Sequence, residues 1–134
     1  MAKIAEIEGI GPVYAEKLSK AGVATIEALL EQAASAKGRK ALAEKSGISE
    51  DKLLEWVNRA DLMRIKGVGS EYSDLLEAAG VDSCAELANR KAENLVQKMT
   101  EVNTAKKLVR KLPTLKLVED WVAQAKKLPK VVTH

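Results

Sequence analysis

Aromatic and redox-active side chains are scarce in this 134-residue chain, which contains no Phe, two Trp, two Tyr, one Cys and one His. A single cysteine excludes an internal disulfide and a multi-cysteine metal site, and it fits a reducing cytoplasm. No apolar stretch approaches the ~20 residues that a membrane span needs, and the N-terminus lacks the apolar core of a signal peptide. We therefore expect a cytoplasmic protein that has no membrane partner.

The residue pairs that usually carry out catalysis are also missing. His134 is the last residue, and Cys84 stands between Ser83 and Ala85, where we expect it to fill a small apolar gap. General acid or base work would fall to Asp, Glu or Lys, which occur here in ordinary helix-surface patterns. A lyase that uses a lysine would need a pocket that lowers the lysine pKa, and no motif indicates one. We expect a protein that is not an enzyme and that has no cofactor.

The residues that are present favour helices. Hydrophobic residues make up 46% of the chain and charged residues 31%, which is typical of a folded globular protein. Because aromatic residues are so few, the core must be built from Leu, Ile, Val and Ala, which suits small helices in close contact. Alternating β-branched runs are rare. The sequence therefore predicts an all-α fold.

An internal repeat is the strongest pattern in the chain. Residues 4–29 match residues 62–87 at a constant offset of 58, and each copy contains a Gly-apolar-Gly element followed by a tyrosine. These elements are Gly9-Ile10-Gly11 with Tyr14, and Gly67-Val68-Gly69 with Tyr72. Trp56 matches Trp121 at an offset of 65, so the second copy has gained seven residues between the two blocks. The chain is predicted to be a tandem duplication, with a first repeat over 1–61 and a second over 62–134, packed as one compact helical protein.

Local signals predict where the helices begin and end. A short first helix with Ala5, Glu6 and Glu8 is expected to stop at Gly9, and Pro12 is suited to start the next helix. Residues that can cap helix N-termini stand at three further places: Thr25, Ser49, and Ser83, the last with Glu86 as a capping box. Gly38 and Gly47 are expected to break the middle of the first repeat.

Each Gly-apolar-Gly element indicates a turn suited to an anion. Backbone N–H groups at a helix N-terminus lack partners and carry partial positive charge, so they favour a phosphate oxygen. We expect glycine at both positions because the chain turns sharply there and because a Cβ would hold a phosphate away. Ile10 and Val68 would tuck inward and fix the turn. Contacts of this kind touch the sugar-phosphate backbone and do not read sequence.

The two segments resemble a known motif. Ile4-x-x-Ile7-x-Gly9-Ile10-Gly11 and Leu62-x-x-Ile65-x-Gly67-Val68-Gly69 are similar to the helix-hairpin-helix motif of DNA repair and recombination proteins. Nearly end to end, the chain looks like the bacterial and archaeal helix-hairpin-helix family known as DUF4332. The resemblance implies paired helix-hairpin-helix repeats whose glycines contact duplex DNA, in some relatives through a bound K⁺ or Na⁺. Several relatives use such repeats to bind protein instead.

Charge and resemblance together give a candidate nucleic-acid site. Residues 104–134 carry eight Lys or Arg against two acids, an excess that favours a polyanion, and we expect these cations on helices. The second turn is the better candidate, because Arg64 and Lys66 precede it, although Glu71 and Asp74 follow it. The expected backbone contacts are Gly67, Val68, Gly69, Lys66, Arg64, Gly9, Ile10, Gly11, Lys17, Lys106, Lys107, Arg110 and Lys111. No metal is expected, apart from the option of a monovalent cation at 67–69.

Other interpretations stay open at this point. The glycine turns could instead simply let helices pack tightly, above all in the first copy. The same fold could present an exposed apolar patch to a protein partner and bind no nucleic acid. Trp56 and Trp121 are expected to anchor the core, since apolar neighbours continue a stripe on their helices. The oligomeric state is not indicated.

Overall fold

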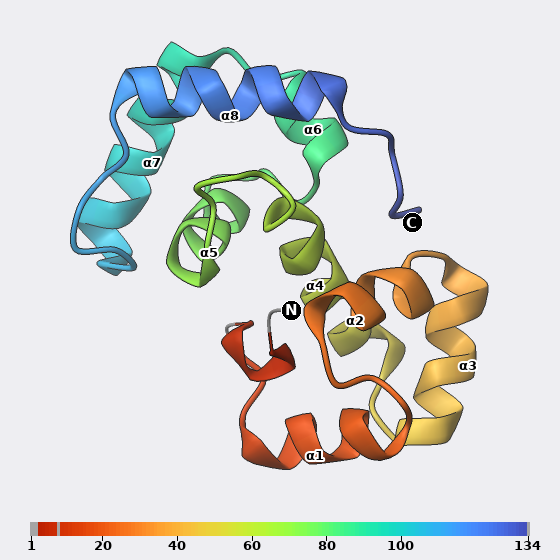
Figure 1. The fold of residues 1–134 in the computed structure, drawn as a ribbon. Coiled ribbons are helices and arrows are strands. Elements are labelled where there is room, and N and C mark those ends of the chain that lie inside the picture. The colour runs from red at the N-terminus through yellow and green to blue at the C-terminus, as the bar shows by residue number, and fades with distance from the viewer. Residues whose placement is uncertain (1–2, 8, 134) are drawn as a thin grey trace. The chain divides into compact units, whose positions relative to one another are not determined.

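The structure is a computed structural model that describes residues 3–7 and 9–133, and within this part the chain is helical (Figure 1). A single isolated bridge between Lys3 and Thr25 is the one β-type pairing among these residues. The helices are η1 (Ile4–Glu6), α1 (Pro12–Lys20), α2 (Ile26–Ala33), α3 (Ala36–Ser46), α4 (Glu50–Leu62), α5 (Ser70–Ala78), α6 (Cys84–Ala88), α7 (Ala92–Lys106) and α8 (Leu115–Lys127). The all-α prediction is confirmed. Glu8 and His134 lie outside the described residues.

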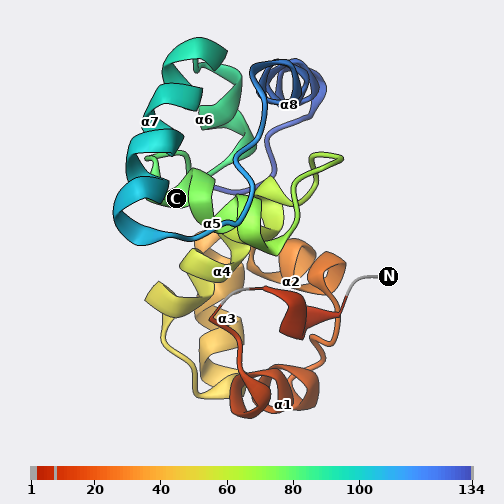
Figure 2. The same cartoon turned by 90° about the vertical axis from the view of Figure 1, so that its left-hand side faces the viewer.

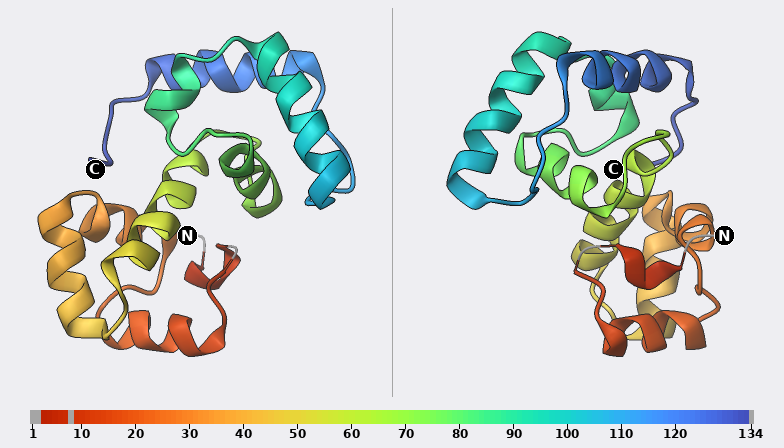
Figure 3. Two further views of the ribbon diagram at one scale, coloured as in Figure 1. Left: turned by 180° about the vertical axis from the view of Figure 1, so that it is seen from behind. Right: turned by 60° about the vertical axis from the view of Figure 1, so that its left-hand side comes forward.

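The chain divides into two compact units. Unit 1 comprises Met1–Asp61 together with Val131–His134, and unit 2 comprises Leu62–Lys130. Figure 2 and Figure 3 show the helices α1, α2 and α3 with most of α4 in unit 1, and α5, α6, α7 and α8 in unit 2. Each unit contains one glycine turn and one tryptophan helix, α4 in unit 1 and α8 in unit 2.

Residues 131–133 belong to unit 1, although the repeat had placed them with the second copy. The amide of Thr133 donates to the Ala34 carbonyl at 2.8 Å, and Arg39 Nη2 donates to the Thr133 carbonyl at 2.6 Å. Arg39 Nη1 also donates to the carbonyls of Ala33 and Ala34. Burial lowers the pKa of Arg39 below its ordinary value, and nearby Glu50 partly offsets this. These backbone pairings hold the last described residues against α2 and α3.

Ser and Thr side chains cap five of the helices. In each case the hydroxyl oxygen accepts a hydrogen bond from the amide three residues later, which satisfies one free donor of the first turn. The caps are Thr25, Ser35, Ser49, Ser83 and Thr114. The predictions for Thr25, Ser49 and Ser83 are therefore confirmed. Among the described residues only the serine half of the predicted capping box is seen, and the Glu86 carboxylate accepts from Arg90 Nε at 3.0 Å.

Gly38 does not break the chain as the sequence suggested, because it lies inside α3. The interruption falls at Ser35, which caps α3 through the Gly38 amide. A Cβ at position 38 would overlap the backbone carbonyl oxygen of Gln32, which cannot move without shifting α2. Glycine at this place therefore permits the close approach of α2 and α3.

Replacing Gly38 with Ala is expected to destabilise the protein by about 2 kcal/mol, since the overlap forces a backbone shift. Helix propensity alone would predict the opposite, a gain of about 1 kcal/mol. Urea denaturation would measure the difference, with Lys40→Ala on the exposed face of α3 as the control. A Gly38→Ala variant as stable as the parent chain would contradict the packing argument.

Candidate nucleic-acid interface

The first glycine of each turn is required by the fold. Gly9 and Gly67 have φ values of +94° and +98°, in the left-handed region that L side chains rarely adopt. A Cβ at Gly67 would lie 3.1 Å from Nε1 of Trp121, and a Cβ at Gly9 would lie 3.3 Å from Nε1 of Trp56. The tryptophan of each copy thus packs against the glycine of its own turn.

The second glycine of each turn is not required by the fold. Gly11 and Gly69 have φ values of −84° and −100°, which any residue adopts. A Cβ at either position would meet nothing within 4 Å. The prediction that the sharp turn needs glycine at both positions is therefore wrong for Gly11 and Gly69. At these two places the backbone is bare and faces open space.

These two bare glycines are also the N-caps of α1 and α5. No side chain caps either helix, in contrast to the five helices that begin with Ser or Thr. The first intrahelical bond of α5 runs from the Ser73 amide to the Gly69 carbonyl at 2.9 Å. The amides before Ser73 in the first turn of α5 therefore keep the partial positive charge of an uncapped helix N-terminus.

Ile10 and Val68 support the turns from inside. Their exposed fractions are 5% and 4%, and their amides donate to the carbonyls of Ile7 and Ile65 at 3.1 Å each. These amides are therefore already paired within the protein. Ile10 and Val68 act as wedges and offer no donor to a ligand.

A tyrosine and a tryptophan meet beside each turn. The ring centroids of Tyr14 and Trp56 are 5.1 Å apart, and those of Tyr72 and Trp121 are also 5.1 Å apart. The tryptophans are 2% and 0% exposed, so the prediction that they anchor the core is confirmed. Trp121 Nε1 is buried and has no hydrogen-bond partner in the described part of the chain. The aligned glycine, tyrosine and tryptophan of each copy thus form one cluster.

A pocket of about 430 Å³ opens at the second turn. It lies between the glycine turn with the start of α5 on one side and the loop between α7 and α8 on the other. Its lining residues are Gly67, Gly69, Ser70, Glu71, Tyr72, Arg110 and Lys111. The Tyr72 hydroxyl donates to the Lys111 carbonyl at 3.0 Å and so ties the two walls together. Two cations, one carboxylate and the bare backbone at Gly69 therefore face one cavity.

A family model described as "Domain of unknown function (DUF4332)" matches residues 8–128 of the chain. The chain belongs to the DUF4332 family. The match spans both glycine turns and the second-turn pocket. No curated protein and no solved structure is significantly similar to this DUF4332 chain.

Arg110 and Lys111 of the DUF4332 chain lie in the loop 107–114 and not on a helix. The expectation of basic helices over 104–130 is wrong at these positions. The loop begins at Lys107, which ends α7 in a left-handed conformation with φ +51°. Leaving the helix there allows the loop to reach the second turn, where the two cations line the pocket.

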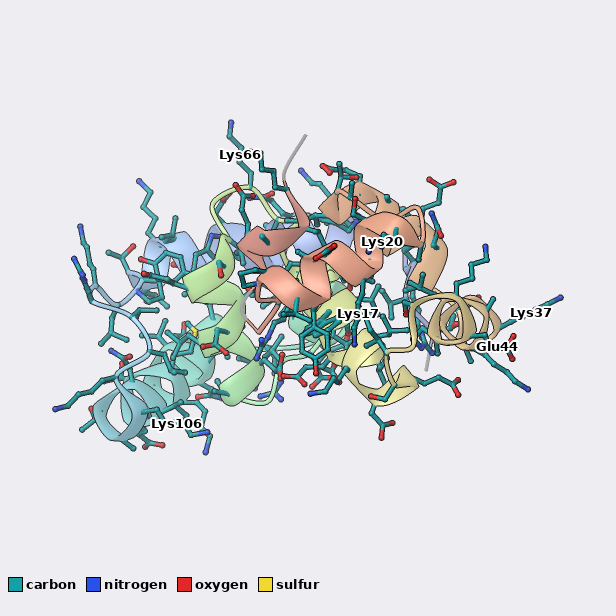
Figure 4. All side chains as sticks on the ribbon, turned by 90° about the horizontal axis from the view of Figure 1, so that it is seen from below. Lys17, Lys20, Lys37, Glu44, Lys66 and Lys106 are labelled. Carbon is teal, nitrogen blue, oxygen red and sulfur yellow. The ribbon has the colours of Figure 1, made fainter. Side chains whose placement is uncertain are left out.

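The other cations expected at the second turn lie elsewhere. Arg64 donates through both Nη atoms to the Pro129 carbonyl at 3.1 Å. Figure 4 shows Lys66 and Lys106 extending from opposite sides of the unit to which both belong. None of these three residues lines the pocket, and neither does Lys107. Of the positively charged residues expected at the second turn, only Arg110 and Lys111 therefore line its pocket.

At the first turn of the DUF4332 chain, Lys17 lies near the tyrosine. Its Nζ atom is 5.8 Å from the centre of the Tyr14 ring, and Nζ of Lys52 is 5.5 Å from the same centre. The neighbouring Glu16 forms an ion pair with Lys20 at 3.2 Å. Both lysines therefore interact with the aromatic face beside this turn.

Sequence reasoning missed Ser70 and Tyr72 as members of the pocket. The signal for Tyr72 is its alignment with Tyr14 at the same distance after the glycine turn. For Ser70 the signal was its place directly after the second glycine, where a helix begins. No sequence signal placed Arg110 beside these residues, because the contact is between distant parts of the chain.

A monovalent cation at residues 67–69 would need backbone carbonyl oxygens as ligands. The carbonyl of Ile65 accepts from the Val68 amide, and that of Lys66 accepts from Gln124 Nε2 at 3.1 Å. Each of these two oxygens, which precede the turn, thus has only its second lone pair left for a cation. Among the described residues no cluster of His, Cys, Asp and Glu could hold a metal ion, and no helix is long and apolar enough to cross a membrane.

Proposed function

We propose that the DUF4332 chain is a non-enzymatic cytoplasmic module that binds the backbone of duplex DNA, or of structured RNA, without reading its sequence. The observation that carries this proposal is the second-turn pocket, where a bare glycine turn shares a cavity with Arg110 and Lys111. The proposal includes the assignment of both copies to the helix-hairpin-helix superfamily.

The chemistry of the pocket suits a phosphate group. The uncapped first turn of α5 supplies backbone N–H donors, and the missing Cβ at Gly69 lets a phosphate oxygen come close. Arg110 and Lys111 add two full positive charges, which Glu71 only partly offsets. Because these groups address phosphate and not base edges, binding would be independent of sequence and sensitive to salt.

The second turn is proposed as the principal contact and the first as an auxiliary or structural one. At the first turn Lys17 and Lys52 lie over the Tyr14 ring, where they already have a partner. Val13, the second residue of α1, is 65% exposed and carries no charge. The matching position in the second copy is Glu71. The two turns therefore share a backbone shape but differ in their charged surroundings.

A protein partner is the second candidate function, favoured by the exposure of Val13. This alternative predicts an exposed apolar patch. Among the described residues the exposed large hydrophobic side chains are Val13 in unit 1 and Leu115 in unit 2, at 65% and 41%. Single exposed apolar side chains are normal on protein surfaces, so nucleic-acid binding ranks first.

Fluorescence anisotropy with a labelled random duplex tests the proposed function. We expect measurable binding at roughly 50 mM salt and a steep loss of affinity by roughly 200 mM, as phosphate contacts release counterions. A pool of different duplex sequences should bind equally well. Absence of binding at the lower salt concentration would overturn the proposal.

Gly69→Ser is expected to change stability and binding in opposite directions. Serine caps a helix slightly better than glycine, so the free energy of unfolding should rise by a few tenths of a kcal/mol. The serine hydroxyl would occupy the α5 amides and its Cβ would fill the bare position, so duplex affinity should fall about tenfold, the loss expected for roughly one phosphate contact.

The matched control is Gly11→Ser, which makes the same change at the first turn. It should give the same small gain in stability with less than about a twofold change in affinity, well below the loss expected for one contact. If Gly69→Ser binds duplex as tightly as the parent chain, the α5 amides are not the contact.

A further inference from the structure

The side chain of Asn103 holds the loop that carries the two cations of the pocket. Its Nδ2 donates to the Val109 carbonyl at 3.1 Å, and its Oδ1 accepts from the Val109 amide at 2.9 Å. The backbone carbonyl of Asn103 also accepts from the Lys107 amide at 2.7 Å. One residue of α7 therefore makes three hydrogen bonds to the segment just before Arg110.

The side chain of Gln124 holds the opposite wall in the same way. Its Oε1 accepts from the Lys66 amide at 2.9 Å, and its Nε2 donates to the Lys66 carbonyl at 3.1 Å. Nε2 also donates to Asp120 Oδ2 at 2.9 Å, which orients the carboxamide on the surface of α8. Lys66 directly precedes Gly67, so this pairing fixes the entry to the second turn.

These two pairings replace hydrogen bonds that the local structure cannot supply. Residues 63–69 and 107–114 lie outside helices, so their backbone groups lack regular helical partners. A carboxamide has both a donor and an acceptor, and it can pair with the N–H and C=O of one residue much as a neighbouring strand would. Asn103 and Gln124 use this capacity beside the two walls of one pocket.

We propose that Asn103 and Gln124 are positioning residues that hold Arg110, Lys111 and the second glycine turn in one arrangement for a polyanion. This inference rests on the proposed function. Without the pairings, the loop and its two long side chains would have to be ordered when the ligand binds. Ordering of this kind costs affinity even when every contact residue is still present.

The first copy carries a different side chain at the position of Gln124. The residue that aligns with Gln124 at the offset of 65 is Arg59, which is 7% exposed. Its Nη1 lies 3.4 Å from the position of a Cβ at Gly9, and its Nη2 pairs with Glu55 at 3.3 Å. Asn103 falls in the region where the second copy gained residues. The pairings made by Asn103 and Gln124 thus belong to the copy that contains the pocket.

Duplex binding by the full chain tests the inference with Asn103→Ala and Gln124→Ala. Each is expected to weaken binding roughly five- to tenfold, the factor for ordering one or two long side chains. Asn94→Ala, an exposed asparagine on the same helix α7, is the control and should leave affinity unchanged. A double-mutant cycle then adds Asn103→Ala to a chain that already carries Arg110→Ala and Lys111→Ala.

In that background Asn103→Ala should have no further effect, because the residues that it positions are gone. An equal loss in both backgrounds would mean that Asn103 supports only the general fold, and the positioning role would be overturned. The same conclusion follows if neither Asn103→Ala nor Gln124→Ala weakens binding while the parent chain binds duplex.

Amide hydrogen exchange without nucleic acid separates this inference from the proposed function. Asn103→Ala should speed exchange in residues 108–112, and Gln124→Ala in residues 65–69, while Asn94→Ala changes neither. Faster local exchange in a protein that binds no duplex would overturn the proposed function, and it would still show that the two residues order the pocket. Unchanged exchange in both segments would reject the inference whatever the duplex assay shows.

Discussion

Replacing Arg110 and Lys111 together with Glu is expected to reduce duplex affinity roughly a hundredfold or more, the loss of two charged contacts. These are the cations that line the pocket with Gly69, so their replacement puts two further carboxylates beside Glu71 and turns attraction for phosphate into repulsion. Log affinity falls with log salt, and the milder pair Arg110→Ala and Lys111→Ala should make this slope shallower by about 2. Anisotropy over a salt series gives both quantities.

The control makes the same change in net charge elsewhere. Lys37→Glu with Lys40→Glu alters two exposed lysines of α3 and also takes the formal net charge from +3 to −1. This variant should lose far less affinity and keep the salt slope of the parent chain. If the two double variants lose affinity equally, the overall charge of the protein and not the second-turn pocket governs binding.

Trp121→Ala is expected to cost about 3–5 kcal/mol of stability, the range for truncating a buried aromatic side chain. Trp121 is fully buried, packs against Tyr72 and lies against Gly67, so its removal empties the centre of unit 2. Urea denaturation followed by circular dichroism would measure the loss.

Trp121→Phe should cost much less, about 1 kcal/mol, although it also removes volume. The indole Nε1 is a buried donor that has no partner among residues 3–7 and 9–133, and deleting such a group recovers part of its desolvation penalty. The comparison with Trp121→Ala therefore separates packing from hydrogen bonding. A Phe variant as unstable as the Ala variant would show that Nε1 makes an interaction that stabilises the fold.

The repeat made much of the core and of the turns predictable. The offset of 58 for Gly67 and Tyr72, and of 65 for Trp121, placed these residues in correspondence with the first copy, and the structure joins each set into one cluster. Caps such as Thr25 and Ser49 were predictable because a hydroxyl and an amide three residues apart act locally. Features that depend on short stretches of chain were therefore within reach of sequence reasoning.

Which residues form the site was only partly predictable, because a count of charged residues does not say where their side chains lie in the fold. The sequence favoured Lys66 for its place beside the turn and named Lys106 and Arg110 with it, yet of these three only Arg110 lines the pocket. The difference comes from the end of α7 at Lys107 and from the pairing of Asn103 with Val109, which are tertiary features. The role of Gly38 was hidden for the same reason, since its neighbour Gln32 lies across a helix contact.

Because the Thr133 carbonyl accepts a hydrogen bond from Arg39, cutting the chain after Asp61 would not separate the two copies cleanly. In a fragment of residues 1–61 the buried guanidinium of Arg39 would lose one of its three acceptors. The apolar site that Val132 fills would also be left empty. The complementary half would end in a tail without its anchor. The first copy therefore uses hydrogen bonds from the end of the second, and its role is better tested by point substitutions than by isolated halves.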